Sequence, residues 1–288
     1  MLKKLSVYAD LIKYKLSLAV ALSSLTGYYL CQSTVDNRIF FLLTGIFLLA
    51  SGSVVINQYT ERITDSVMER TRNRPIPSKK ISEKRAILIG SFLLISGCVF
   101  LYNNGITPFL LGVLNVILYN LIYTTLKKTT ILSIIPGALV GAIPPMIGFS
   151  SAGGTLLHQN IIAFSAFMFL WQLPHFWLII IKYGKEYKDA GFATISNYLN
   201  EIQIRHLVFF WVLVSTGFLL FFCFLADALD KSIFIFLSLL NLTFIFFFYR
   251  MLFLKKGTRE IKGAFILINS FSFLIMLLII VVSIFEGI

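Results

Sequence analysis

Charged side chains are scarce in this chain of 288 residues: Asp, Glu, Lys and Arg make up 13% of it, and only 13 residues are acidic. Hydrophobic residues account for 58%, and the mean hydropathy is +0.86. A soluble domain of this length has too little interior to hide so much apolar surface. The composition therefore excludes a soluble globular protein and predicts an integral membrane protein.

Cysteine is also rare, and several common catalytic motifs are missing. Cys31, Cys98 and Cys223 lie far apart, in or at apolar stretches and without CxxC spacing. We therefore expect packing residues, and neither disulfides nor a thiolate metal site. No GxxxxGK[ST], GxGxxG or Ser–His–Asp arrangement occurs, so nucleotide hydrolysis and serine hydrolysis have no support.

Most of the charges that are present are basic, which gives a formal net charge of +12. Their placement in short loops between apolar stretches argues against a nucleic-acid partner and for a lipid bilayer with an anionic cytoplasmic face. The predicted spans are nine, at residues 16–31, 39–56, 86–102, 108–125, 131–149, 161–181, 207–226, 233–252 and 265–285. The fold class is therefore all-α: a polytopic membrane protein with one transmembrane domain over residues 1–288, its helices forming a single bundle.

The basic residues also predict the orientation. All but Arg38 and Lys231 of the 25 Lys and Arg residues fall in the N-terminal segment or in even-numbered loops. This asymmetry places the N-terminus in the cytoplasm and, with nine spans, the C-terminus on the opposite side of the plasma (inner) membrane. The short basic segment 1–15 is expected to lie along the membrane interface.

The densest polar chemistry follows the second span, in the sequence NQYTERITDSVMERTRNRPIP that begins at Asn57. Asn57, Glu61 and Asp65 recur at steps of four, which places them on one face of a helix. Oxygen ligands on one face suit Mg²⁺, which commonly bridges to substrate phosphates. The pattern is also typical of a solvated loop. However, it begins directly after the apolar LLASGSVVI, where polar ligands are costly unless they have a function.

Arginines follow this stripe at once, at Arg70, Arg72 and Arg74. Their planar guanidinium groups match phosphate oxygens two at a time. Together, the stripe and the arginines predict a site for a metal-bound phosphate or diphosphate. A cavity that opens to the cytoplasm is expected there, because a second polar segment, from Lys182 to Gly191, emerges on the same predicted side.

The stripe resembles the first signature, NxxxDxxxD, of the intramembrane aromatic prenyltransferase superfamily, with Glu61 in place of the middle aspartate. The continuation MERTRNRP at residues 68–75 resembles one branch, the haem O synthases or protohaem IX farnesyltransferases. The resemblance implies that Asn57, Glu61 and Asp65 are catalytic ligands of Mg²⁺. It also implies that Arg70 and Arg74 bind the diphosphate.

A second polar cluster lies at the predicted cytoplasmic end of the fourth span and comprises Tyr119, Asn120, Tyr123, Lys127 and Lys128. Tyrosines and lysines at a helix end are ordinary interface anchors. The resemblance implies instead that Tyr123, Lys127 and Lys128 help to hold the diphosphate. Which of the two lysines does so stays open.

The sixth span contains the motif WQLPHFW, from Trp171 to Trp177. A histidine inside a membrane indicates function, although a hydrogen-bonded structural histidine is the alternative. The PHFW string resembles the haem O synthase branch, which implies that His175, with Trp171 and Phe176, faces the haem substrate. Ligation of the haem iron and a hydrogen bond to haem both stay open.

The segment after this span carries Lys185, Glu186, Tyr187 and Gly191, which resemble the branch's second signature, an aspartate before a tyrosine with a glycine downstream. Glu186 takes the aspartate position, and the resemblance implies that it is the fourth catalytic metal ligand. The wider superfamily has DxxxD here. This chain departs from it, because Asp189 does not fall in register.

The resemblance covers nearly the whole chain and implies an activity. The enzyme would transfer the farnesyl group of farnesyl diphosphate to a vinyl group of haem b, with addition of water, giving haem O and diphosphate. Mg²⁺ is the implied cofactor and haem b a substrate. Haem A synthase or a terminal oxidase, which belong to the implied haem O and haem A pathway, are candidate partners that the residues leave open.

Two alternatives remain at this point. One is a sister prenyltransferase with a quinone precursor or chlorophyll-type acceptor, against which PHFW argues. The other is a non-catalytic membrane protein that handles or transports haem. Transporters also place polar groups at cavities, but they do not need a carboxylate–arginine diphosphate site at one face.

Overall fold

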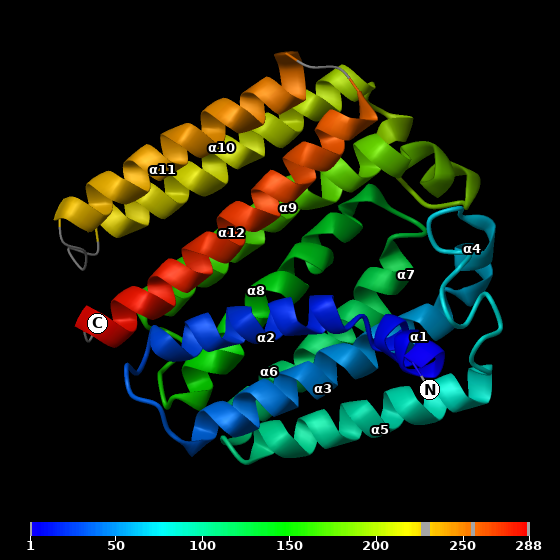
Figure 1. The fold of residues 1–288 in the computed structure, drawn as a ribbon, viewed down its shortest axis with the longest axis horizontal. Helices are drawn as coiled ribbons and strands as arrows, with labels where there is room; N and C mark the ends of the chain where they lie inside the picture. Colours follow the sequence, from blue (N-terminus) through cyan, green and yellow to red (C-terminus); the bar gives the residue numbers. More distant parts are fainter. Residues whose placement is uncertain (1, 226–230, 255–256, 287–288) are drawn as a thin grey trace.

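The computed structural model describes residues 2–225, 231–254 and 257–286, and every regular element within these ranges is helical. Figure 1 shows long helices packed side by side, with α10 and α11 at one edge of the bundle and α3 and α5 at the other. The elements are α1 (Leu2–Ile12), α2 (Tyr14–Tyr29), α3 (Asn37–Thr60), α4 (Arg62–Val67), α5 (Glu83–Tyr102), α6 (Ile106–Ile117), η1 (Leu118–Tyr123), α7 (Thr124–Leu126), η2 (Ile131–Ser133), α8 (Ile134–Ser151), α9 (Gln159–Asp189), η3 (Ile195–Asn197), α10 (Glu201–Leu225), α11 (Lys231–Tyr249), η4 (Arg250–Leu254) and α12 (Thr258–Glu286).

The predicted spans all fall on helices, and eight helical stretches in the described ranges are long and apolar enough to cross a membrane. The first predicted span corresponds to α2, which has 16 residues and is not among the eight. At about 1.5 Å per residue it is ~24 Å long, less than the ~30 Å hydrocarbon core. Nine spans therefore stay a prediction, in which α2 is the ninth. The seventh predicted span ends at Ala226, which lies outside the described residues.

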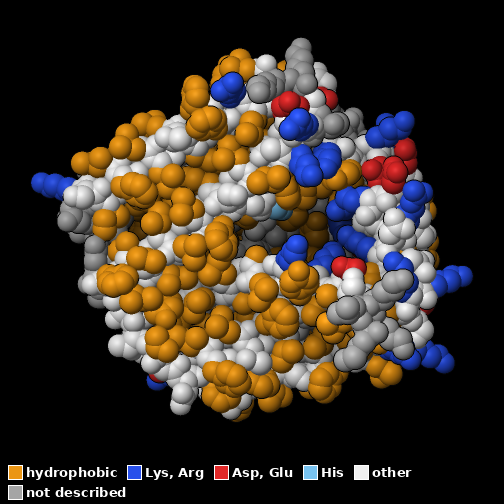
Figure 2. Space-filling view, viewed as in Figure 1, with side chains coloured by type: hydrophobic (Ala, Val, Ile, Leu, Met, Phe, Trp, Pro, Cys, Tyr) orange, Lys and Arg blue, Asp and Glu red, His pale blue; other side chains and the backbone are white. Residues whose placement is uncertain are grey.

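Outward-facing apolar side chains show how the bundle meets lipid. On α5, Leu88, Phe92, Ile95 and Val99 are exposed and recur at the spacing of one helix face. The opposite face of α5 packs against α3. Figure 2 shows apolar side chains over most of the visible surface, whereas Lys and Arg gather toward one side, around a hollow. This arrangement is that of a membrane protein with a polar opening at one end.

Short polar connections reverse the chain between helices. The predicted NNG turn joins α5 to α6, where Gly105 has φ = 122°, a conformation that favours glycine. At the start of α3, the Asp36 carboxylate accepts a hydrogen bond from the backbone N–H of Arg38 at 2.8 Å and caps the helix. The Tyr28 hydroxyl donates to the same carboxylate at 2.7 Å and ties the end of α2 to this cap.

The helix α8 lies between α2 and α9, and small residues let it approach α2 closely. A Cβ atom added to Gly148 would lie 1.7 Å from the Ser24 carbonyl oxygen, and one added to Gly27 would lie 1.9 Å from the Pro145 carbonyl oxygen. Because both neighbours are backbone atoms, no side-chain rotation relieves the clash. The two glycines therefore fix the separation of α2 and α8, which form one wall of the site.

Gly148→Val is expected to lower the free energy of unfolding by about 1–3 kcal/mol, because α2 and α8 have to move apart to admit the side chain. Thermal unfolding of the detergent-solubilised protein measures this effect. Gly217→Val on α10 is the matched control, since a Cβ there meets nothing within 4 Å. Equal melting temperatures for the two variants would contradict the close approach of α2 and α8.

Candidate active site

A cavity of about 490 Å³ lies inside the bundle and is lined mainly by α2, α3, α6, α8 and α9 and by the loops at their ends. Most of the lining is apolar. Its charged side chains comprise four cations and two carboxylates, a formal charge of +2: Lys13, Glu61, Asp65, Arg70, Arg74 and Lys127. A basic end on an otherwise apolar cavity suits an anionic group attached to a hydrophobic molecule.

The predicted stripe of oxygen ligands lines this cavity, although it is not on one unbroken helix. Asn57 lies in the last turn of α3, Glu61 caps the end of that helix, and Asp65 lies on α4. Backbone hydrogen bonds run from the Glu61 N–H to the Asn57 carbonyl at 2.9 Å and from the Asp65 N–H to the Glu61 carbonyl at 2.7 Å. These bonds preserve the four-residue step across the break, so the three side chains stay on the cavity side.

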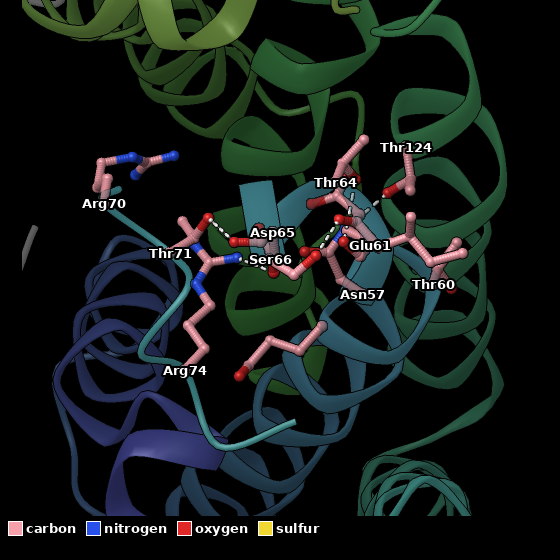
Figure 3. A network of polar contacts seen from close by, with 12 residues as sticks. Asn57, Thr60, Glu61, Thr64, Asp65, Ser66, Arg70, Thr71, Arg74 and Thr124 are labelled. Atoms are coloured by element: carbon pink, nitrogen blue, oxygen red, sulfur yellow. Dashed lines mark hydrogen bonds and ion pairs between the residues drawn. The ribbon is translucent and has the colours of Figure 1, made fainter. Parts of the chain in front are cut away.

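Both carboxylates of the stripe are held by cations from later in the chain, and Figure 3 shows the pair of Asp65 and Arg74. The Arg74 guanidinium donates to the Asp65 carboxylate at 2.6 Å, and the Lys127 ammonium pairs with Glu61. Burial lowers the pKa of Lys127, and the Glu61 carboxylate beside it acts in the opposite direction. Thr71 also donates to the Asp65 backbone carbonyl at 3.0 Å and holds the arginine loop against α4.

Arg70 lies at the mouth of the cavity, where it joins the stripe to the end of α9. It is exposed, its guanidinium donates to the Tyr187 hydroxyl at 2.7 Å, and its backbone N–H donates to the Glu186 carboxylate at 3.1 Å. Glu186 is not among the lining residues. The first and second predicted signatures therefore do meet in space, with Tyr187 rather than Glu186 on the cavity wall.

The donor set on the α3–α4 wall fits Mg²⁺ by its chemistry, since an amide oxygen and two carboxylates are hard oxygen ligands. Asn57 donates its amide nitrogen to Thr124 Oγ1 at 3.0 Å, which leaves the amide oxygen as the atom that can meet a cation. Within the described ranges, however, no three His, Cys, Asp or Glu side chains come together to hold a metal ion. Glu186 does not complete a cluster with Glu61 and Asp65.

Thr124 fixes the orientation of Asn57 through a π-helical turn. In η1 the chain is wound more loosely than in an α-helix, and Thr124 Oγ1 donates to the Tyr119 carbonyl, five residues back, at 2.7 Å. The same oxygen accepts the Asn57 amide N–H, and Thr124 and Asn57 are both buried. One hydroxyl thus ties the wider turn to the α3–α4 wall that carries the predicted metal ligands.

Thr124→Val keeps the shape of the side chain and removes both hydrogen bonds. We expect the Mg²⁺ concentration needed for half-maximal binding of inorganic diphosphate to rise about fivefold, the equivalent of ~1 kcal/mol for one net hydrogen bond. A Mg²⁺ titration of diphosphate binding measures this shift. Thr125→Val, at the exposed neighbouring position, should leave the titration unchanged. Identical titration curves for the two variants would show that the Thr124 hydroxyl does not orient Asn57 for metal binding.

The structure separates the two lysines that follow η1. Lys127 lines the cavity and lies 5.1 Å from the centre of the Tyr123 ring and 5.5 Å from that of Phe192. Lys128 is exposed and is not among the lining residues. Tyr123 also lines the cavity, with its ring 5.9 Å from Phe176. The sequence predicted that one of these two lysines helps to hold the diphosphate. The helix geometry shows that Lys127 is the one that faces the cavity.

His175 faces the same cavity from α9. Its ring lies 4.7 Å from Phe265 and 5.9 Å from Phe176, and its Nδ1 atom is buried with no hydrogen-bond partner in the described part of the chain. A buried ring nitrogen without a partner is costly for folding alone. The ring also hydrogen-bonds to the Asn269 side chain on α12, so His175 has one partner inside the bundle and one nitrogen left for a ligand.

Trp171 packs against His175 outside the cavity lining. Its indole N–H donates to the Ile268 backbone carbonyl at 3.2 Å, its ring lies 5.2 Å from His175, and it is not among the lining residues. Phe176 does line the cavity. Of the three predicted haem-facing side chains, two therefore reach the cavity, and Trp171 connects α9 to α12.

The helix α9 is longer than the predicted sixth span, because it continues to Asp189 without a break. His175 and Glu186 lie eleven positions apart on this helix, about 16 Å at ~1.5 Å per residue. The cavity therefore has a basic end at Arg70 and an aromatic end near His175. Their separation leaves room for a long apolar group between the two.

Other lining residues are absent from the predicted site, notably Lys13, Gln172, Tyr119 and Tyr187. Tyr119 and Tyr187 belong to the predicted polar cluster and second signature but had no predicted role, and the helical period could have assigned one to Tyr119 because it is four positions before Tyr123. Lys13 is one of several basic residues of the N-terminal segment, and its sequence context carries no signal of a site.

The fold and this arrangement of carboxylates, cations and aromatic rings define an intramembrane enzyme of prenyl transfer. The chain belongs to the UbiA prenyltransferase family, which matches residues 20–283.

Relatives in this family narrow the comparison. The chain is 36% identical to the protoheme IX farnesyltransferase of Geobacter sulfurreducens over 186 residues, which are 65% of this chain and 69% of the relative. It is 36% identical to the protoheme IX farnesyltransferase of Cytophaga hutchinsonii, over 68% of this chain and 69% of the relative. With the protein of the same description from Bdellovibrio bacteriovorus, the identity is 33% over 74% and 75%.

Solved structures share the architecture at low identity. A digeranylgeranylglyceryl phosphate synthase superimposes with a TM-score of 0.77 and 16% identity, covering 98% of this chain and 99% of that one. A UbiA homologue from Archaeoglobus fulgidus, in complex with GPP and Mg²⁺, gives a TM-score of 0.72 and 14% identity, covering 96% and 99%. The all-helical fold is thus that of the family.

Proposed function

We propose that this chain transfers the farnesyl group of farnesyl diphosphate to a vinyl group of haem b, with addition of water, giving haem O and diphosphate. The observation that carries the proposal is the pairing, in one cavity, of a carboxylate–cation end with an aromatic end that holds the unpartnered His175 nitrogen. The relatives named protoheme IX farnesyltransferase support the same acceptor.

The basic end would hold the diphosphate. Asn57, Glu61 and Asp65 supply oxygen ligands, and Mg²⁺ bound there would neutralise the charge that develops on the leaving group. Arg74 and Lys127 already pair with the two carboxylates, so both cations can turn from the carboxylates to the phosphate oxygens as the diphosphate arrives.

Additional groups complete this end in the proposal. Arg70 adds a guanidinium at the mouth. Glu186, which accepts a hydrogen bond from the Arg70 backbone N–H, would be the fourth metal ligand. Lys128 remains outside the cavity and contributes only to the surrounding positive potential.

The cavity wall between the two ends suits an allylic cation. The rings of Tyr119 and Tyr123 stack at 6.0 Å, and Phe176 continues the row at 5.9 Å from Tyr123. Aromatic faces attract a cation and exclude water from it. When the carbon–oxygen bond to diphosphate breaks, the haem vinyl group attacks the farnesyl cation. Water then adds to the haem-side cation and loses a proton, so the product carries a hydroxyl.

His175 would position the haem acceptor. His175 lines the cavity, and its Nδ1 atom has no hydrogen-bond partner among the described residues, so a turn of the ring would make this atom available to the iron or to a polar group of haem. Phe176 packs against the acceptor, and Trp171 supports His175 through its hydrogen bond to α12. Both modes of His175 action place haem at the aromatic end.

We also propose that the cavity opens to the cytoplasm of a bacterial plasma (inner) membrane, with the N-terminus on that side and the C-terminus across it. The uneven distribution of Lys and Arg along the sequence supports this orientation. Reporter fusions after Ile288 test it, because a fusion active only in the cytoplasm contradicts the odd number of spans.

Release of inorganic diphosphate tests the acceptor. Purified protein supplied with farnesyl diphosphate and Mg²⁺ should release diphosphate rapidly with haem b. With an aromatic quinone precursor, or with no acceptor, release should be much slower. Faster release with the quinone precursor would identify a sister prenyltransferase, and no release with any acceptor would support a haem-handling protein.

A further inference from the structure

Gln172 lines the cavity and belongs to the WQLPHFW motif, but the proposed chemistry gives it no role. It lies on α9, three positions before His175 and four before Phe176, so it shares their side of the helix and lies one turn farther from the mouth. Its amide makes no hydrogen bond to another described residue, and neither amide atom is buried. The amide therefore meets the open space of the cavity.

Two glycines of α8 set the place of this amide. A Cβ atom added to Gly141 would lie 2.4 Å from the Gln172 Nε2 atom, so the amide occupies the space that this glycine leaves open. One turn nearer the mouth, a Cβ atom on Gly137 would lie 2.9 Å from the Tyr123 ring and 3.2 Å from the Phe176 ring. The amide is therefore about 6 Å, one helical turn, below the aromatic row that is proposed to meet the allylic cation.

Two more polar side chains line the cavity without a partner. Asn115 on α6 has a buried amide oxygen with no hydrogen-bond partner among the described residues, and the Ser53 hydroxyl on α3 makes no hydrogen bond to them either. A Cβ atom on Gly112 would lie 3.1 Å from the Leu49 Cδ2 atom, so α6 and α3 touch one turn before these two residues. Unpaired polar groups inside a membrane protein are costly unless they bind a ligand.

Water is the ligand that fits these groups. Two amides and a hydroxyl carry no charge, so they suit a neutral molecule that both donates and accepts hydrogen bonds. The farnesyl chain has no such groups, whereas a water molecule held inside a protein takes about two to four polar partners. The proposed reaction consumes one water for each haem b that is converted.

We propose that Gln172, placed by Gly141, holds the water that adds to the haem-side cation, and that Asn115 and Ser53 hold further water beside it. This inference rests on the proposed function, because it names the side chain that handles the water of that reaction. The held water donates one hydrogen bond to the Gln172 amide oxygen, which turns its lone pair toward the reacting carbon.

The bonds and charges of this step balance. Attack of the vinyl group on the farnesyl cation forms the carbon–carbon bond and leaves the positive charge on the vinyl carbon next to the porphyrin ring. The water oxygen bonds to that carbon, and the proton that the new hydroxyl loses goes to the diphosphate released in the first step. Without a held water, the same cation loses a proton from the adjacent carbon instead. The product is then an alkene that is lighter by one water.

The masses of the pigment products test this role. Purified full-length protein receives haem b, farnesyl diphosphate and Mg²⁺, and the ratio of hydroxylated to dehydrated pigment is measured. Gln172→Met removes the amide and keeps an unbranched side chain. It should lower the ratio about fivefold, as expected when one hydrogen bond is lost from the transition state of water addition.

Gln159→Met is the matched control, because Gln159 is exposed at the start of the same helix, and it should keep the wild-type ratio. An unchanged ratio in Gln172→Met would overturn the proposal whatever the turnover of the variant, since a structural role lowers both products together.

Gly141→Ala moves the amide without removing it. The added methyl group would overlap the position of the Gln172 Nε2 atom, so the amide has to shift and the ratio should fall here as well. If Gln172→Met lowers the ratio and Gly141→Ala does not, Gln172 holds the water and Gly141 does not place it. If Gln172→Met fails to fold, an unchanged ratio in Gly141→Ala overturns the proposal.

The same product analysis separates this inference from the proposed function. A wild type that forms no prenylated haem, or only the dehydrated pigment, overturns the proposed function and this inference with it. If the wild type forms the hydroxylated pigment and Gln172→Met forms it at the same ratio, the proposed function stands and only the role of Gln172 is wrong.

Discussion

Asp65→Ala is expected to abolish prenyl transfer while the protein still inserts into the membrane. The substitution removes a metal ligand and also the carboxylate that positions Arg74 through a 2.6 Å hydrogen bond, so the metal and the guanidinium are both less well placed to neutralise the leaving group. Metal ions contribute several kcal/mol to stabilising such charge, and each ~1.4 kcal/mol is about tenfold in rate. We therefore expect turnover to fall at least about 100-fold at saturating farnesyl diphosphate. Product formation at several Mg²⁺ concentrations measures the loss.

Glu69→Ala is the matched control for this variant. Glu69 is also acidic and close in sequence, but its side chain is 78% exposed, against 5% for Asp65, and its ion pair is with the exposed Arg72. It should retain wild-type turnover. Glu61→Asp should also be tolerated, since aspartate is the residue of the superfamily signature. Full activity of Asp65→Ala at limiting Mg²⁺ would contradict the ligand assignment.

His175→Ala is the second large effect that we expect, and it separates the two ends of the cavity. Loss of the imidazole should weaken haem b binding about tenfold or more, which corresponds to ~1.4 kcal/mol of binding free energy, because either a neutral hydrogen bond or an iron ligand is removed. Farnesyl diphosphate binding should be unchanged, since the basic end lies about 16 Å away along α9. Titration of each substrate against the purified variant measures both affinities.

His206→Ala controls for the loss of any histidine. His206 is exposed on α10, and its Nδ1 atom hydrogen-bonds to the Ile202 carbonyl at 2.8 Å, away from the cavity lining. It should bind both substrates normally. If His175→Ala weakens the binding of both substrates, the histidine is structural. If the variant changes neither the two affinities nor turnover, His175 does not belong to the site.

Much of the fold follows from hydropathy alone. Each predicted span coincides with a helix, because in a membrane only internally hydrogen-bonded segments can cross lipid, and long apolar runs mark them. The Asn57–Glu61–Asp65 stripe was predictable for a similar reason, since a four-residue step keeps side chains on one face. Its break at Glu61 was not, because the capping of α3 depends on the tertiary contacts of the following loop.

Other features depend on contacts between segments that are distant in sequence. Nothing in the adjacent Lys127 and Lys128 distinguishes them until the loosely wound η1 directs Lys127 toward Glu61. Lys13 was predicted to lie at the membrane interface with its neighbours, but it lines the cavity. The sequence does not show this, because the end of α1 is anchored by a distant residue, the buried Gln58, through the Leu11 carbonyl. Trp171 was predicted to face haem, but its indole N–H donates a hydrogen bond to the Ile268 carbonyl on α12. Local sequence carries the ligand types, whereas the packing of helices decides which of them meet.

The central claim, that one cavity joins a farnesyl group and water to haem b, is tested most directly by the mass of the pigment product. Purified protein should be incubated with haem b, farnesyl diphosphate and Mg²⁺ in water enriched in heavy oxygen. The account predicts a pigment heavier than haem b by one farnesyl group and one hydroxyl, with the heavy oxygen in that hydroxyl. Unmodified haem b, or a farnesylated pigment without the heavy oxygen, would contradict it.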